Sequence, residues 1–175
     1  MSKGGSELRE RRSLLIGSGS VRYGQTPMSP GGMRSGYFPI EGFSFASCQA
    51  TTPDRSDFAL EAPLEPRPGG ITFGGVSTVV FNMTAHGDGF CSMGPISFEE
   101  LTEAPTEPLL GSRYEPSGVP VKAGHTYCFR MNRGKFFGKL VVKDCSPGRY
   151  EGRINFDYVL QRNGSRNLRN PSQEK

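Results

Sequence analysis

Residues 125–161 constrain the fold most strongly, because apolar and polar side chains alternate along three successive segments. A two-residue turn at Arg133-Gly134 folds the first two segments into an antiparallel hairpin. The hairpin register pairs Met131 with Phe136, Phe129 with Gly138, Tyr127 with Leu140 and His125 with Val142. After a second turn, the third segment continues the apolar face with Ile154, Phe156, Tyr158 and Leu160. The pattern predicts a three-stranded meander whose register is firm, because a one-residue slip would expose every apolar side chain.

Gly138 has a packing role in this register, because it lies opposite Phe129 on the apolar face. A glycine at this position leaves space for the aromatic ring to lie across the neighbouring backbone. We therefore expect Gly138→Val to destabilise the fold, although valine favours strands. The other face of the hairpin carries Thr126, Cys128, Arg130, Lys139 and Lys143.

Short apolar segments between turn residues predict further strands before the meander. These strands fit residues 42–49, 58–60 and 71–85. Phe43 and Phe45 share one face of the first strand, and Ser97 and Glu100 have the capping-box spacing of a single helical turn. Together, these strands and the meander predict an all-β fold, either an antiparallel β-sandwich or a partly open barrel. It has a C-terminal three-stranded meander and a long irregular N-terminal arm.

The chain divides at two changes in composition. Residues 1–36 are rich in Gly, Ser and Arg and form an extended arm, residues 37–161 form the β-domain, and residues 162–175 form a basic C-terminal tail. Within the arm, Gly17-Ser18-Gly19-Ser20 lacks the lysine of a phosphate-binding loop and indicates a linker. Because the arm holds few apolar residues, we expect the domain to fold and melt almost unchanged without residues 1–36.

Positive charge is concentrated at the two ends of the chain. Residues 1–36 have a net charge of +4 and residues 162–175 of +3, whereas residues 37–161 have −3. Basic terminal segments favour anionic surfaces such as lipid headgroups, nucleic acid or an acidic protein patch, the alternative being that they only keep the chain in solution. The candidate partner-binding residues are Arg9, Arg11, Arg12, Arg22, Tyr23 and Arg34.

The four cysteines lack the spacing of a zinc site. Cys128 and Cys145 are not opposite each other in the hairpin register, so the pairing of any disulfides stays open. Arg11-Arg12 begins a twin-arginine-like stretch, but the apolar run after it is too short for a signal peptide, and no segment has the length of a transmembrane helix. We expect a cytoplasmic protein with reduced thiols, free or peripheral at a membrane, with export left open.

A family resemblance covers residues 96–161. The motifs are ISFEELTEAP, VPVKAGHTY, GKFFGKLVV and INFDYVLQ. In this order they resemble a largely uncharacterised bacterial all-β domain found in exported proteins, and more distantly the closing hairpins of hemophore-type haem-binding β-proteins. The resemblance implies a fold more than an activity, and this chain departs from the exported relatives in lacking a recognisable export signal.

Sequence patterns that indicate chemistry are few. His86 and His125 are the two histidines and are candidate haem ligands from opposite sides, although a histidine entering a strand is more often packed or hydrogen-bonded. No nucleophile elbow or other triad spacing is present. The sequence predicts no enzyme, no metal site and no cofactor.

We therefore expect a non-catalytic structural or accessory subunit. It would dock through its N-terminal arm on the protein subunits of a larger, membrane-associated assembly, where its basic ends would face anionic headgroups. Nucleic acid is a poor candidate, because the basic segments lack interleaved exposed aromatics. The alternative is a ligand-binding β-module for haem or glycan.

Overall fold

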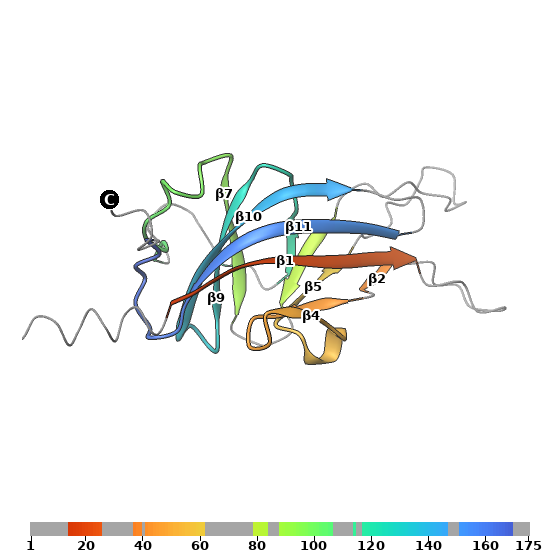
Figure 1. Cartoon of the computed structure of the whole chain (residues 1–175), viewed down its shortest axis with the longest axis horizontal. Coiled ribbons are helices and arrows are strands. Elements are labelled where there is room, and N and C mark those ends of the chain that lie inside the picture. Colours follow the sequence, from red (N-terminus) through yellow and green to blue (C-terminus); the bar gives the residue numbers. More distant parts are fainter. Residues whose placement is uncertain are drawn as a thin grey trace, which may run out of the picture.

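A computed structural model describes residues 14–25, 37–39, 41–61, 79–83, 88–106, 114, 117–146 and 151–169. The described residues form an all-β structure without an α-helix, whose single helical element is the short 3-10 turn η1 (Pro53–Arg55). Their strands make two antiparallel sheets, shown in Figure 1. The prediction of an all-β antiparallel fold is confirmed.

The larger sheet has six strands and contains the predicted meander. Its order is β2 (Tyr37–Pro39), β1 (Leu14–Gln25), β11 (Glu151–Gln161), β10 (Phe136–Ser146), β9 (Thr126–Met131) and β7 (Gly89–Gly94). Strands β9 and β10 pair Phe129 with Gly138 and Tyr127 with Leu140, and the Val142 amide donates to the His125 carbonyl at 3.1 Å. The predicted register is therefore confirmed.

The smaller sheet has five strands, and the two sheets are not closed into a barrel. Its order is β4 (Gln49–Thr51), β3 (Gly42–Ser44), β5 (Phe58–Glu61), β6 (Val80–Met83) and β8 (Ser117–Pro120). The strand predicted over residues 42–49 is wrong in its length. The chain turns back over residues 45–48, where Cys48 has a φ of 57°.

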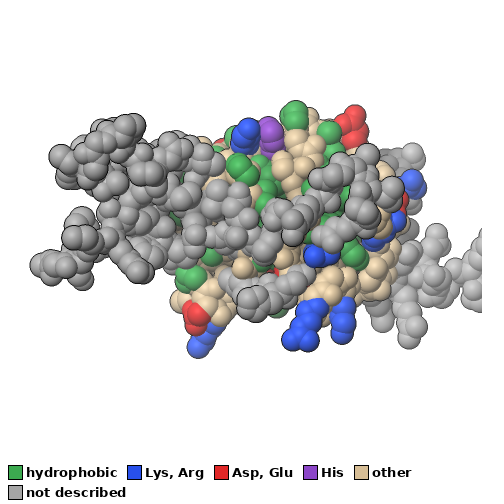
Figure 2. Space-filling model, turned by 180° about the vertical axis from the view of Figure 1, so that it is seen from behind, with side chains coloured by type: hydrophobic (Ala, Val, Ile, Leu, Met, Phe, Trp, Pro, Cys, Tyr) green, Lys and Arg blue, Asp and Glu red, His purple; other side chains and the backbone are tan. Residues whose placement is uncertain are grey.

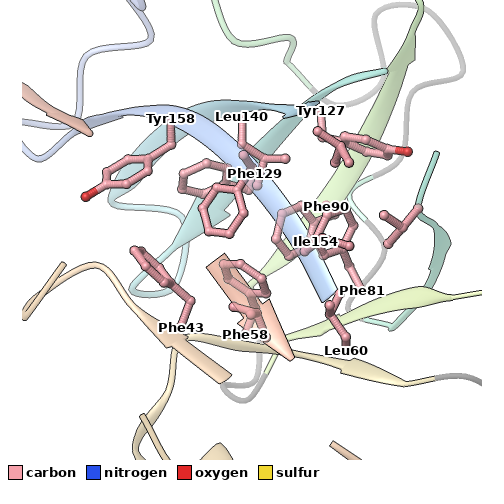
Figure 3. Packing of buried hydrophobic residues seen from close by; sticks show 14 of the residues in the cluster. Phe43, Phe58, Leu60, Phe81, Phe90, Tyr127, Phe129, Leu140, Ile154 and Tyr158 are labelled. Carbon is pink, nitrogen blue, oxygen red and sulfur yellow. The ribbon is translucent and has the colours of Figure 1, made fainter. Parts of the chain in front are cut away.

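Aromatic rings from both sheets meet in one core, as Figure 3 shows. Phe45 stacks on Phe129 with 4.7 Å between ring centroids, and Phe43 meets Phe156 edge-on at 5.1 Å. Phe58 meets Phe90 edge-on at 5.4 Å. Offset and edge-to-face arrangements of this kind are the favourable ones for aromatic pairs, so the two sheets are joined by specific ring packing and not by area alone.

The predicted irregular arm is wrong for residues 14–25, which form the long strand β1. This strand pairs with β11 from Leu14 opposite Gln161 to Gly24 opposite Glu151. Val21 and Tyr23 are fully buried in the core. The composition is misleading because Gly17 and Gly19 occupy inward positions beneath aromatic rings of β11, while Ser18 and Ser20 lie on the other face.

The turn between β9 and β10 has four residues, not the predicted two. Asn132, Arg133 and Gly134 all have positive φ, and the Lys135 amide donates to the Met131 carbonyl at 3.1 Å. The buried carboxylate of Asp88 accepts hydrogen bonds from the Asn132 and Arg133 amides at 3.1 and 2.8 Å. These bonds compensate for a backbone conformation that non-glycine residues adopt at some cost.

Candidate functional site

The two ends of the described chain meet at one end of the six-stranded sheet. Leu14, the first residue of β1, lies opposite Gln161, the last residue of β11. Gln161 also lies opposite Phe137, the second residue of β10 after the β9–β10 turn. Figure 1 shows β1 beginning and β11 ending on the left. We call this region, with residues 133–135 and 162–169, the basic end.

The basic end carries five cationic side chains. They are Arg133, Lys135, Arg162, Arg166 and Arg169, of which four are exposed and Arg166 is half-buried. A β-carbon placed on Gly164 would be 3.6 Å from the Lys135 carbonyl, so the turn and the C-terminal segment are adjacent. Figure 2, in which this end lies to the right, shows Lys and Arg side chains beside acidic ones there.

Successive side-chain to backbone hydrogen bonds shape residues 163–169. The Asn163 side-chain oxygen accepts from the Ser165 amide at 2.8 Å, the Ser165 hydroxyl accepts from the Asn167 amide at 3.1 Å, and the Asn167 side-chain oxygen accepts from the Arg169 amide at 3.1 Å. Asn and Ser favour such local turns. Gly164 fits the same segment with a φ of 80°.

Leu168 fixes this segment to the sheet. Its side chain is fully buried and its amide donates to the Thr102 carbonyl at 2.8 Å, while the Ala104 amide donates to the Arg166 carbonyl at 2.8 Å. Residues 162–169 therefore pack against the connection between β7 and β8, although their composition alone predicts only a basic tail.

A shallow groove of about 330 Å³ lies between these two segments. Its lining residues are Thr102, Glu103, Ser165, Arg166, Asn167 and Arg169. The Arg166 guanidinium forms an ion pair with the Glu103 carboxylate and donates to the Ala104 carbonyl at 3.2 Å. One arginine of the groove is thus fixed in place, and the exposed Arg169 lies beside it.

Two carboxylates near the basic end accept hydrogen bonds from backbone amides inside the fold. Asp57 accepts a hydrogen bond from the Phe45 amide at 2.7 Å, and burial raises the pKa of its carboxyl. Asp88 caps the β9–β10 turn. The exposed carboxylates of the neighbouring connection are Glu99, Glu100 and Glu103, so the five cations outnumber them.

Arg22 and Tyr23, both predicted to bind a partner, are engaged within the fold. The Arg22 guanidinium donates from Nε to Glu41 at 2.8 Å, and this contact holds the pKa of the Glu41 carboxyl below its ordinary value. Tyr23 is fully buried, so its prediction as a surface residue is wrong. Tyr23 points inward because it continues the alternation of β1, in which glycines at the inward positions 17 and 19 hide the apolar pattern. Arg9, Arg11, Arg12 and Arg34 lie outside the described residues.

Only one histidine of the proposed haem-binding pair lies among the described residues. His125 is half-buried at the start of β9, where its amide donates to the Lys122 carbonyl at 3.2 Å, and its ring centroid lies 6.4 Å from that of Tyr127. His86 lies outside the described residues. The haem alternative therefore stays a prediction.

Sequence reasoning missed a second buried cluster on the outer face of the large sheet. Its members are Cys91, Leu101, Ala104, Tyr114, Cys128 and Leu168. Lys139 lies on the same face with 1% exposure, and its ammonium donates to the carbonyls of Phe98 at 2.5 Å and Leu101 at 2.9 Å. Burial lowers the pKa of this lysine. The apolar residues Leu101 and Leu168, isolated in polar stretches, were the available signal.

Within the described ranges, no three His, Cys, Asp or Glu side chains are grouped as metal ligands would be. The same residues include no helix of the length and apolarity needed to span a bilayer. Searches against protein-family models, curated proteins and solved structures give no match. Function must therefore be argued from the basic end itself.

Proposed function

We propose that this protein is a non-catalytic accessory module that docks through its basic end onto an acidic surface of a partner protein. The observation that carries the proposal is the pairing of Leu14 with Gln161, because it places the start of β1 beside the start of residues 162–169. Residues 1–13 contribute a net charge of +2, and residues 162–175 contribute +3. A partner that binds at this end of the fold could therefore draw on positive charge from both terminal parts of the sequence.

The donors at the basic end suit carboxylates. Three of the five cations are arginines of the C-terminal segment, and a guanidinium presents a planar fork that matches a carboxylate in two hydrogen bonds. Arg166 already forms an ion pair with Glu103 through Nη2, while the neighbouring Arg169 is exposed. An acidic side chain entering the groove would therefore meet the Arg166 guanidinium, which is already ion-paired, and the exposed Arg169 guanidinium.

A protein partner is favoured over insertion into a bilayer. Ile16, at 46%, is the one large hydrophobic side chain that is exposed among the described residues. Interfacial membrane binding draws on apolar area as well as on charge. Electrostatic complementarity between proteins steers their encounter and fixes their register.

The test uses two probes and two variants of equal charge. Poly-L-glutamate represents an acidic protein surface, and vesicles of phosphatidylcholine with phosphatidylserine represent a bilayer. Lys135→Ser with Arg169→Ser removes two cations from the basic end, and Lys122→Ser with Arg153→Ser removes two exposed cations elsewhere. Circular dichroism confirms that each variant is folded.

The wild-type chain should bind poly-L-glutamate, and binding should weaken strongly between about 50 and about 300 mM NaCl. The basic-end variant should bind about tenfold more weakly, whereas the control variant should lose much less affinity. Equal losses in both variants would show that net charge, not the basic end, is responsible. Preference for the vesicles would overturn the choice of a protein partner.

A further inference from the structure

Strand pairing places two buried cysteines side by side on the outer face of the six-stranded sheet. Cys91 of β7 lies directly opposite Cys128 of β9, which in turn lies opposite Lys139 of β10. Cys91 is 4% exposed and Cys128 is fully buried. Both side chains belong to the cluster closed by Leu101 and Leu168.

The backbone geometry of this pair suits a cross-strand bond. Directly opposed residues of antiparallel strands have α-carbons about 4.5 or 5.5 Å apart, depending on the hydrogen-bonding position. Disulfides join α-carbons separated by about 4.4 to 6.8 Å. Both positions fall within that range, so the separation of the two backbones suits a disulfide between these thiols, which are free in this structure.

The other two cysteines are placed differently. Cys145 packs against the main core, on the opposite face of the sheet, and Cys48 is exposed in the turn between β3 and β4. Among the described strands, β7 lies at the edge of its sheet and pairs there with β9 alone. A link between Cys91 and Cys128 would therefore fasten the edge of the sheet, together with the attached segment that carries Glu103.

We infer that Cys91 and Cys128 form a disulfide when the chain folds in the presence of a small-molecule disulfide, and that this bond locks β7 to β9. The inference concerns the opposite face from the aromatic core and does not depend on the proposed docking function. It gives the fold a reduced form and a more stable oxidised form, of which the second suits an oxidising compartment.

The chemistry is two successive thiol–disulfide exchanges with glutathione disulfide. The thiolate of Cys91, on the edge strand, attacks one sulfur of glutathione disulfide and releases one glutathione thiolate. The thiolate of Cys128 then attacks the Sγ atom of Cys91 in the mixed disulfide, which forms the Cys91–Cys128 bond and releases the second glutathione thiolate. Two electrons pass to glutathione and two protons leave the cysteines. Burial raises the pKa of the Cys128 thiol, so exchange should occur during folding and not in the closed native state.

The experiment refolds the full chain from denaturant in glutathione buffer, blocks remaining thiols by alkylation and maps disulfides by mass spectrometry. Cys48→Ala with Cys145→Ala retains only the proposed pair, and Cys91→Ala with Cys128→Ala retains only the other two cysteines. The first variant should form one intramolecular disulfide, and its melting temperature should rise by about 5 to 10 °C, reversibly on reduction. The second variant should form none.

Two results would overturn the inference. The first is complete alkylation of Cys91 and Cys128 after refolding in glutathione disulfide. The second is an oxidised form that melts below the reduced one, which would show that the bond strains the strand pair instead of stabilising it. The variant that lacks Cys48 and Cys145 keeps the test valid even if removal of the buried pair prevents folding, because it leaves the second cluster intact.

Discussion

Gly19 of β1 lies opposite Phe156 of β11, and the phenylalanine ring occupies the space that a side chain at residue 19 would need. A β-carbon placed on Gly19 would be 2.4 Å from Cζ of Phe156 and 2.7 Å from Cε2 of Phe43. Three further glycines of the large sheet lie beneath rings in the same way: Gly17 under Tyr158, Gly138 under Phe129 and Gly152 under Tyr23. The glycines of these strands are therefore part of the core packing.

Gly19→Ala should destabilise the fold by about 2 kcal/mol, because the added methyl group must displace two buried rings. Thermal unfolding followed by circular dichroism measures the effect. Ser20→Ala, on the other face of the same strand, is the control and should change stability by no more than about 0.5 kcal/mol. Equal effects at both positions would contradict the placement of Gly19 beneath Phe156.

Gly138→Val should also destabilise, since a β-carbon there would be 2.2 Å from Cζ of Phe129 and 2.7 Å from the Val159 carbonyl oxygen. Phe129→Ala alone should cost about 3 to 5 kcal/mol. The double variant should cost less than the sum of the two single variants, because valine then enters the space that the ring left. Strict additivity in denaturant unfolding would show that the two residues do not share that space.

Buried tyrosines should make the protein sensitive to alkali. Burial raises the pKa of Tyr127 to about 12 and also raises the pKa of Tyr114 and of Tyr158. Their unfolded pKa is about 10, so the folded state holds more protons above that pH, and the free energy of unfolding should fall as pH rises from about 10 to about 12. In an alkaline titration, tyrosinate absorbance should rise at a higher pH in the native protein than in protein unfolded by guanidinium. Superimposable titrations would contradict the burial of these rings.

Two truncations should distinguish the contribution of β1 to stability from that of residues 1–13. A chain lacking residues 1–13 should melt within about 3 °C of the full chain, because every described core residue is retained. A chain lacking residues 1–25 should lose cooperative unfolding, since it loses Val21 and Tyr23 and exposes the edge of β11. Cooperative melting of the shorter chain near the full-length temperature would restore the idea of a dispensable arm.

The meander could be predicted from sequence because its alternation is strong and local. Phe156 and Tyr158 are buried as their spacing requires, and Gly138 lies beneath Phe129 as the register requires. Strand β1 could not be recognised in the same way, because Gly17 and Gly19 supply no apolar signal at inward positions. The rings that fill those positions come from β11, more than 100 residues later in the chain.

The basic end was only partly predictable. The charge of both terminal segments is visible in the sequence, but the adjacency of the start of β1 and the end of β11 depends on the long-range pairing of Leu14 with Gln161. The covered outer face was missed because Lys139 and Cys128 alternate as exposed residues would. Their burial depends on Leu101 of the β7–β8 connection and Leu168 of the C-terminal segment, which pack on this face.

Whether residues 14–25 form a core strand decides which basic residues are left to meet a partner. Hydrogen exchange measured by mass spectrometry tests it directly. Strand β11 pairs on both sides, whereas β1 pairs mainly with β11. About half of the amides in residues 14–25 should therefore exchange at least about 100-fold more slowly than in an unfolded chain, beside nearly full protection of residues 151–161. Unprotected exchange throughout residues 14–25, with protection retained in residues 151–161, would contradict the strand and the basic end built on it.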